Sequence, residues 1–458
     1  MRDDEFIDVT SLGAADMLEA VRDGRIRAEE LVNALLARIR ADEDRVRAWA
    51  FLDEQRALEQ ARNVDRVRRE GHPMGPLHGL PVGVKDIIDT ADMPTENGTV
   101  LHAGRRPMDD ATVVERLRSA GAIILGKTVT TELATYAPGK TRNPVNPEHT
   151  PGGSSSGSAA AVAAQMVPVA IGTQTNGSVI RPAAFCGVYG FKPSFGLIPR
   201  HGVLRQSRPL DQVGVMARSV EDLAIIAEPL MGFDARDPDT RPVARPDLRA
   251  VAMQEPPLPP VFALTRTPNW GDAEEQTRLA FDEVADMLGG QCWAFEVPGL
   301  FRDAWDWHRA IMEADIARSF HHEYEKGRDR LSESLRRQIE RGRLVTAVDY
   351  NNAVDRIGAV SAAFDEVFDR ADALLTIAAP GPAPRGLEST GSPDFCTLWT
   401  FAGMPAVTLP LLRAENGMPM GVQLIGRRGD DARLLRTTRW LVRRAQEPER
   451  GELERGER

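Results

Sequence analysis

Three polar clusters, each set among small or apolar residues, carry the side chains that are able to do chemistry in this chain. Lys85 ends a run of Gly, Leu, Pro and Val residues. Burial after such a run lowers the pKa of a lysine and makes it a usable base near neutral pH. The structural alternative is an ordinary ion pair with the neighbouring Asp86.

The other two clusters are rich in glycine and hydroxyl side chains. Residues 152–158 hold three glycines and four serines, more serines than the start of a helix needs for its cap. Residues 173–178 end on Ser178. A loop of this kind can direct successive backbone N–H groups at the oxyanion of a tetrahedral intermediate, although a plain strand-to-helix turn is the alternative.

Two further motif matches offer different chemistry. Gly121–Thr128 satisfies the P-loop pattern, but its variable positions read Ala-Ile-Ile-Leu. Those residues belong in a buried strand, whereas a P-loop needs a flexible loop between a strand and a helix. We therefore expect a structural role for Lys127 rather than nucleotide binding.

Gly153–Gly157 satisfies Gly-x-Ser-x-Gly, the nucleophile elbow of α/β-hydrolases, with Ser155 as the nucleophile. That mechanism needs an acid and then a histidine downstream. Histidines are present but not distinctively placed, and the elbow leaves Lys85 and residues 173–178 unexplained. An esterase using Ser155 therefore stays an alternative.

The elements that must position these clusters alternate between strand and helix, which predicts an α/β fold with helices covering a sheet. Asp110 is predicted as the N-cap of a helix that Gly121 closes. Small side chains at 158–167 predict a central, buried helix. The other elements predicted in the first half are helices around 31–39 and 52–61 and strands at 79–86, 122–125 and 167–171.

The second half has a different pattern. The proline-rich segment 234–260 is predicted as a long surface connection, and 272–288 and 305–368 as helical. Ala406–Leu409 and Val422–Ile425 flank a turn at Asn416-Gly417 and predict a hairpin.

Composition limits the classes of function. The 458 residues are 42% hydrophobic and 27% charged, with a net charge of −10, so we expect repulsion from nucleic acid and anionic membranes. The N-terminus lacks the features of a signal peptide, which predicts a cytoplasmic location. Cys186, Cys292 and Cys396 lie far apart and are expected to be reduced, buried thiols. No metal-type spacing occurs, so no metal or cofactor is expected.

The clusters occur together with further motifs along the chain. These are Leu125–Thr128, Gly172–Ser178, Pro182–Gly187, Gly190–Pro193, Gly403–Ala406 and Gly417–Gly426, besides the Lys85 run and Gly152–Ser155. In this order, and with 24 residues from Ser154 to Ser178, they resemble the amidase signature family over nearly the whole chain.

The resemblance implies a mixed β-sheet between layers of helices and a Ser-cisSer-Lys triad. Ser178 would form the acyl-enzyme, Ser154, held in a cis peptide, would relay protons, and Lys85 would be the base. The backbone N–H groups of Thr175, Asn176, Gly177 and Ser178 would form the oxyanion hole, with Ser155 in support. Such an enzyme cleaves C–N acyl bonds of small amides, anilides or carbamates (urethanes), and requires no cofactor.

The sequence departs from the family pattern near the nucleophile. Many members have Asp where this chain has Gln174, Gly where it has Asn176, and Arg where it has Ile180. In this chain the arginine, Arg181, comes one residue later. These departures argue against, but leave open, a partner-dependent amidotransferase A-type subunit. A catalytically silent subunit and a homodimer also stay open.

We expect one domain over residues 1–445, with its core motifs in 79–200 and a charged tail at 446–458. Helices from 234–374 are expected to frame the acyl pocket. Trp305, Trp307 and Trp399 are candidates to line it.

Overall fold

The computed structural model describes residues 8–446 and is built around one mixed sheet. Its strand order is β1-β3-β2-β4-β6-β5-β10-β11-β9-β7-β8. The strands are β1 (Trp49–Leu52), β2 (Pro81–Lys85), β3 (Ile123–Thr128), β4 (Val169–Gln174), β5 (Tyr189–Lys192), β6 (Gln212–Ala217), β7 (Phe262–Arg266), β8 (Cys292–Glu296), β9 (Ala373–Ile377), β10 (Ala406–Arg413) and β11 (Pro419–Ile425).

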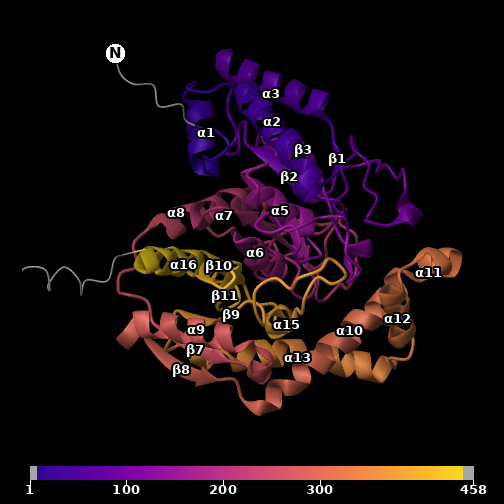
Figure 1. Cartoon of the computed structure of the whole chain (residues 1–458), viewed down its shortest axis with the longest axis vertical. Helices are drawn as coiled ribbons and strands as arrows, with labels where there is room; N and C mark the ends of the chain where they lie inside the picture. Colours follow the sequence, from indigo (N-terminus) through magenta and orange to yellow (C-terminus); the bar gives the residue numbers. More distant parts are fainter. Residues whose placement is uncertain (1–7, 447–458) are drawn as a thin grey trace, which may run out of the picture.

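Helices flank this sheet, as the alternating pattern predicts (Figure 1). They are α1 (Ala14–Arg22), α2 (Ala28–Val46), α3 (Glu54–Arg69), α4 (Thr112–Ser119), α5 (Ser156–Ala163), α6 (Ile180–Cys186), α7 (Val220–Ala227), α8 (Leu248–Met253), α9 (Glu275–Leu288), α10 (Ala304–Ser319), α11 (His321–Gly327), α12 (Glu333–Gly342), α13 (Ala347–Ala363), α14 (Asp365–Phe368), α15 (Asp394–Phe401) and α16 (Asp431–Gln446). Within residues 8–446, no helix has the length and apolar character needed to cross a membrane.

The strands that position the polar clusters lie together in the sheet. β2 pairs in parallel with both β3 and β4, and every residue of these three strands is buried. Strands covered on both faces read as continuous apolar runs, which is why Val, Ile, Leu and Gly dominate them. Because parallel strands end at the same edge, the end of β2 at Lys85 lies beside the end of β4 at Gln174.

The helix predicted from small side chains is α5, and all of its residues except the last, Ala163, are buried. Its residue Gly157 explains why small residues are required. A Cβ built there would lie 2.3 Å from both the Ala48 carbonyl oxygen and the Val129 backbone nitrogen. Any larger residue would push α5 away from the sheet and displace the serines at its N-terminus.

Several local expectations are confirmed. The P-loop match forms strand β3 rather than a phosphate-binding loop. The predicted hairpin is the antiparallel pair of β10 and β11. Gly121 follows α4 with a φ of +88°, the left-handed conformation with which glycine commonly ends a helix.

Other local expectations are wrong. Asp110 does not cap α4, because its carboxylate accepts from the Ala91 backbone N–H and from Arg118, each at 2.8 Å. The connection at 234–260 contains the short helix α8, which packs against α16. Cys186 and Cys396 are buried free thiols, but Cys292 is only half-buried. Most of the predicted charged tail lies outside the described residues.

The helical region after residue 300 forms a second body of packed apolar side chains. α10 contacts α12, α13 and α15, and most of their buried apolar residues belong to a core distinct from the main core, which extends along the sheet. Figure 1 shows α10, α12 and α13 together on one side, far from α1 to α3, with α5 and α6 between. The site lies where these two bodies meet.

Candidate active site

Lys85 lies at the end of β2 with a completely buried side chain. Its Nζ is 2.7 Å from Ser154 Oγ and 2.8 Å from Thr173 Oγ1. Within residues 8–446 it forms no ion pair. Burial lowers the pKa of Lys85 well below its usual range, and only the more distant Asp211 charge opposes this shift. A neutral amine between two hydroxyls can accept a proton from either of them.

Asp86 does not neutralise Lys85, so the ion-pair alternative is wrong. The Asp86 carboxylate lies 3.7 Å from Lys127 Nζ and also faces the Glu96 backbone N–H. β2 ends at Lys85, and Asp86 is the first residue of the turn that follows, where its carboxylate faces Lys127 rather than Lys85. Lys127 is buried and also donates to the Ile88 carbonyl at 2.7 Å.

The serine cluster joins the end of β2 to the end of β4. The Gly153–Ser154 peptide bond is cis, and Ser154 is buried against Lys85. The Ser155 backbone N–H donates to the Ser178 carbonyl at 3.4 Å, which brings the two serine segments side by side.

Ser155 itself has the environment of a structural residue. Its Oγ donates to the Thr173 carbonyl and accepts from the Thr173 backbone N–H, both at 3.2 Å, and the side chain is fully buried. No histidine among the described residues bonds to it. The elbow mechanism requires an exposed hydroxyl beside a histidine, so the geometry disfavours Ser155 as a nucleophile.

The loop that carries Ser178 is fixed by Gln174. Its side-chain carbonyl accepts from the backbone N–H groups of Val179 and Ile180, at 2.8 and 3.0 Å, while its amide donates to Thr400 Oγ1 at 2.9 Å. A neutral amide thus accepts from the first N–H groups of α6, an acceptor role that a carboxylate would also fill. The departure from Asp at this position keeps the loop's hydrogen bonding intact.

Ser178 is 9% exposed, and its hydroxyl makes no hydrogen bond within residues 8–446. The backbone N–H groups of Thr175, Asn176, Gly177 and Ser178 likewise have no acceptor in that part of the chain. Such donors are what an oxyanion needs. The Asn176 side chain is fixed, since it donates to Tyr136 at 3.2 Å and accepts from Thr397 at 2.8 Å.

Arg181 is buried, with 1% of its surface exposed. Its guanidinium donates to the Gly153 carbonyl at 2.7 Å and to Thr390 at 3.2 Å. Nε and Nη1 have no hydrogen-bond partner among the described residues. Arg181 therefore ties the helix after Ser178 to the peptide that precedes Ser154, whereas the residue at the family's arginine position, Ile180, is an apolar core residue.

A cavity of about 560 Å³ adjoins this loop. Among the predicted site residues only Asn176 lines it, and most of the remaining wall comes from α10 and α12. Trp305 lines the cavity, whereas Trp307 packs on Phe401 and Trp399 is a buried core residue against Phe364. The wall is strongly polar and carries both signs of charge, through Arg309, Glu313, Glu333, Arg337, Arg341 and Asp394.

Sequence reasoning missed the residues that hold the loop from outside. Thr175 is contacted by Gln206 and Asp211, which belong to one turn, and by His308 of α10. Burial lowers the pKa of His308 to about 4, so its neutral ring donates to the Thr175 carbonyl. None of the three stands in a recognisable local motif. Residues 8–446 contain no group of three or more His, Cys, Asp or Glu arranged to hold a metal ion.

Comparison with known proteins shows the family of this chain. The family model for amidases matches residues 30–435. The chain is 35% identical to the A-type subunit of the glutamyl-tRNA(Gln) amidotransferase from Chloroflexus aggregans, over 93% of this chain and 96% of that relative. It superposes on the peptide amidase of Stenotrophomonas maltophilia with a TM-score of 0.83 at 30% identity, covering 95% of this chain and 97% of the amidase.

Another solved structure comes from a vestigial protein complex that reveals the origins of an s-triazine catabolic enzyme. It superposes with a TM-score of 0.88 at 27% identity, covering 94% of this chain and 98% of that one. The chain therefore belongs to the amidase signature family, a class of hydrolases and amidotransferases with a large mixed sheet flanked by helices.

Proposed function

We propose that this protein is an amidohydrolase that cleaves C–N acyl bonds through an acyl-enzyme on Ser178, with Ser154 as proton relay and Lys85 as base. The observation that carries the proposal is the environment of Lys85. A fully buried lysine that contacts two hydroxyls and no carboxylate is suited to be a neutral base. The unpaired backbone donors around Ser178 support the same assignment.

In the proposed acylation step, neutral Lys85 takes a proton from Ser154 while Ser154 takes one from Ser178. The Ser178 oxygen forms a bond to the acyl carbon, and the carbonyl electrons move to oxygen. The backbone N–H groups at 175–178 stabilise that oxyanion because they are already positioned before charge develops. The result is a tetrahedral intermediate and a protonated Lys85.

Collapse of the intermediate breaks the C–N bond. The proton on Lys85 returns through Ser154 to the leaving nitrogen, which departs as a neutral amine. Water then attacks the acyl-enzyme, the same side chains accept its proton, and Ser178 is regenerated with release of a carboxylic acid. A carbamate cleaved at its C–N bond leaves an alkoxycarbonyl group on Ser178. Water releases this group as a carbonic acid monoester, which breaks down to the alcohol and CO2, so the mechanism serves amides, anilides and urethanes alike.

The test compares wild type, Ser178→Ala and Ser155→Ala on one aryl anilide and its matched aryl carbamate, with release of the aniline as the readout. We expect only Ser178→Ala to abolish turnover, and the ratio of the two substrates to define the preferred acyl group. A dead Ser155→Ala variant with an active Ser178→Ala variant would establish the elbow mechanism instead.

A second candidate is a partner-dependent amidotransferase A-type subunit. The observation that favours it is the 35% identity to the corresponding chain of a glutamyl-tRNA(Gln) amidotransferase, along almost the whole of both proteins. Ammonia release from glutamine that appears only on addition of partner subunits would support this candidate. Turnover of the anilide by the isolated chain supports the amidohydrolase.

A further inference from the structure

Thr175 is the first residue of the loop that leads to Ser178, and its hydroxyl has two close acceptors. Thr175 Oγ1 lies 2.6 Å from Gln206 Oε1 and 2.7 Å from Asp211 Oδ1. A hydroxyl has one proton to donate. Thr175 can donate to only one of these two oxygens. The second contact therefore needs a proton from Asp211, or a Gln206 amide turned so that its nitrogen faces Thr175.

The orientation of Gln206 is fixed by its other end. Its Nε2 donates to the Leu133 carbonyl at 2.9 Å. Rotation of the amide by 180° would place oxygen against oxygen at Leu133, so Gln206 must present its carbonyl to Thr175. The Thr175 proton then belongs to the bond with Gln206, and the contact with Asp211 lacks a proton unless the carboxyl supplies one.

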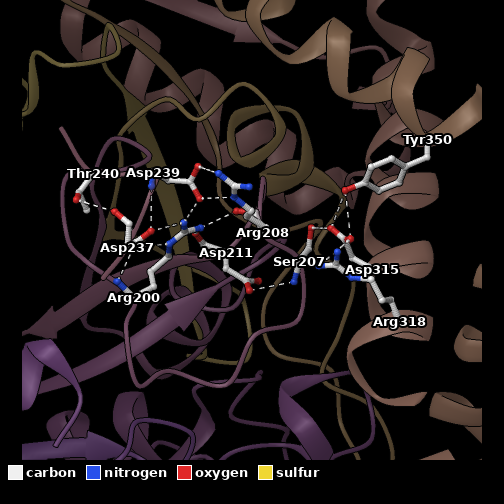
Figure 2. A network of polar contacts seen from close by, with 10 residues as sticks. All are labelled: Arg200, Ser207, Arg208, Asp211, Asp237, Asp239, Thr240, Asp315, Arg318 and Tyr350. Carbon is white, nitrogen blue, oxygen red and sulfur yellow. Dashed lines mark hydrogen bonds and ion pairs between the residues drawn. The ribbon is translucent and has the colours of Figure 1, made fainter. Parts of the chain in front are cut away.

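The other contacts of Asp211 fit this assignment. Its second oxygen, Oδ2, accepts from the backbone N–H groups of Gln206 and Ser207, at 2.9 and 3.0 Å. Oδ1 is left to face Thr175, where an acid proton is useful. Figure 2 shows Asp211 beside Ser207, while Arg200 reaches past it to Asp237 and Asp239.

Arg200 does not neutralise the Asp211 carboxyl directly. It donates to the main-chain carbonyl of Asp211 at 3.0 Å, and its ion pairs are with Asp237 and Asp239. Burial raises the pKa of Asp211 to about 6, against the lowering effects of Thr175, of Arg200 and of two backbone N–H groups. When Thr175 donates to Gln206 instead, its lowering effect is lost, and the pKa of Asp211 lies above that value, in favour of the neutral acid.

From these contacts we infer that Asp211 is held as a neutral carboxylic acid that donates its proton to Thr175 and so fixes the loop that carries Ser178. Asp211 is thus a positioning residue. Its effect on kinetics rests on the amidohydrolase reaction proposed above. Each contact in this series then has one donor and one acceptor: Asp211 donates to Thr175, Thr175 donates to Gln206, and Gln206 donates to the Leu133 carbonyl. His308 fixes the main-chain carbonyl of Thr175, so this residue is held at both ends.

The protonation state of Asp211 also bears on the base. Asp211 is the carboxyl group that acts on Lys85, and its ionised form raises the pKa of that lysine. A neutral Asp211 leaves Lys85 with its pKa lowered by burial alone. Other charged and titratable groups near this turn are Arg200 and Arg208 with their partners Asp237 and Asp239, His308 of α10 and, through the Ser207 hydroxyl, Asp315 of α10.

Asp211→Asn tests the assignment, because an amide copies a protonated carboxyl in shape, charge and donor. Asp239→Asn is the matched control, since Asp239 belongs to the same network but pairs with Arg200 and Arg208 and does not contact Thr175. The first readout is the infrared band of a protonated carboxyl C=O at neutral pH. We expect Asp211→Asn to lose a band that wild type and Asp239→Asn both retain.

This readout needs no turnover, so it stands even if the proposed reaction fails. In the kinetic arm, Asp211→Asn should keep kcat/KM within about threefold of wild type with an unchanged acid limb, and Asp211→Ala should lose about tenfold or more. The same band in Asp211→Asn as in wild type would overturn the inference. An acid limb shifted to lower pH in Asp211→Asn would also overturn it, because that shift would mean an ionised Asp211.

Discussion

Arg181 donates a hydrogen bond of 2.7 Å to the Gly153 carbonyl, although 28 residues separate the two in sequence. The contact links the helix that follows the proposed nucleophile to the peptide that places the proposed relay. Since Arg181 is buried, water does not replace the guanidinium when it is removed. The relative position of Ser178 and Ser154 therefore depends on this side chain.

Replacement of this arginine tests the link. Arg181→Leu should lower kcat/KM by about tenfold or more, because small displacements of reacting groups are costly. It should also lower the free energy of unfolding by about 1–3 kcal/mol through loss of charged hydrogen bonds. Steady-state kinetics and urea unfolding measure the two effects, with the exposed Arg205→Leu as control. If kcat/KM is the same in both variants, Arg181 does not help to position the site.

Lys85 gives stability a specific pH dependence. Its pKa is lowered in the folded state, so the unfolded chain binds more protons over the interval between the folded pKa and 10.5. The free energy of unfolding of wild type should therefore rise with pH in that interval, relative to Lys85→Met. Lys85→Met should be inactive at every pH. Parallel stability curves for the two proteins would mean that Lys85 is not neutral in the fold.

Gln174 tests what anchors the nucleophile loop. Gln174→Ala leaves the backbone N–H groups of Val179 and Ile180 without an acceptor and removes one of the hydrogen bonds of Thr400, so the free energy of unfolding should fall by about 1–3 kcal/mol. Turnover should fall as well, because Gln174 no longer holds the loop whose backbone N–H groups at 175–178 would form the oxyanion hole. Chemical denaturation and kinetics check this, and Gln55→Ala on the exposed side of α3 serves as control. An unchanged kcat would contradict the role of Gln174.

Substitution of Ser155 should affect stability, whereas substitution of Ser178 should affect catalysis. Ser155→Ala removes both contacts with the Thr173 backbone, which should cost about 1–3 kcal/mol of unfolding free energy. Ser178→Ala should be as stable as wild type, since the Ser178 hydroxyl makes no hydrogen bond within residues 8–446. Calorimetry of the two variants measures the difference. A Ser178→Ala variant less stable than Ser155→Ala would reverse these assignments.

The sequence by itself determined the local elements and the residues that enter the site. The apolar run before Lys85 predicts a buried strand, and the small residues at 158–167 predict a closely packed helix, because both features depend on neighbours along the chain. The same is true of the strand at 122–125, which excluded a P-loop. Motif order then identified Ser154 and Ser178 as the candidate relay and nucleophile through family resemblance.

The tertiary structure alone decided which groups face one another. Lys85 contacts Ser154 and Thr173 rather than its neighbour Asp86, because the strand ends at Lys85 and the turn after it places Asp86 against Lys127. Asp110, a plausible cap by sequence, bonds to a different loop. The contact between Thr175 and Asp211 joins the end of β4 to a turn 36 residues later. Such pairs depend on how the sheet brings distant strands together, and no local pattern records that arrangement.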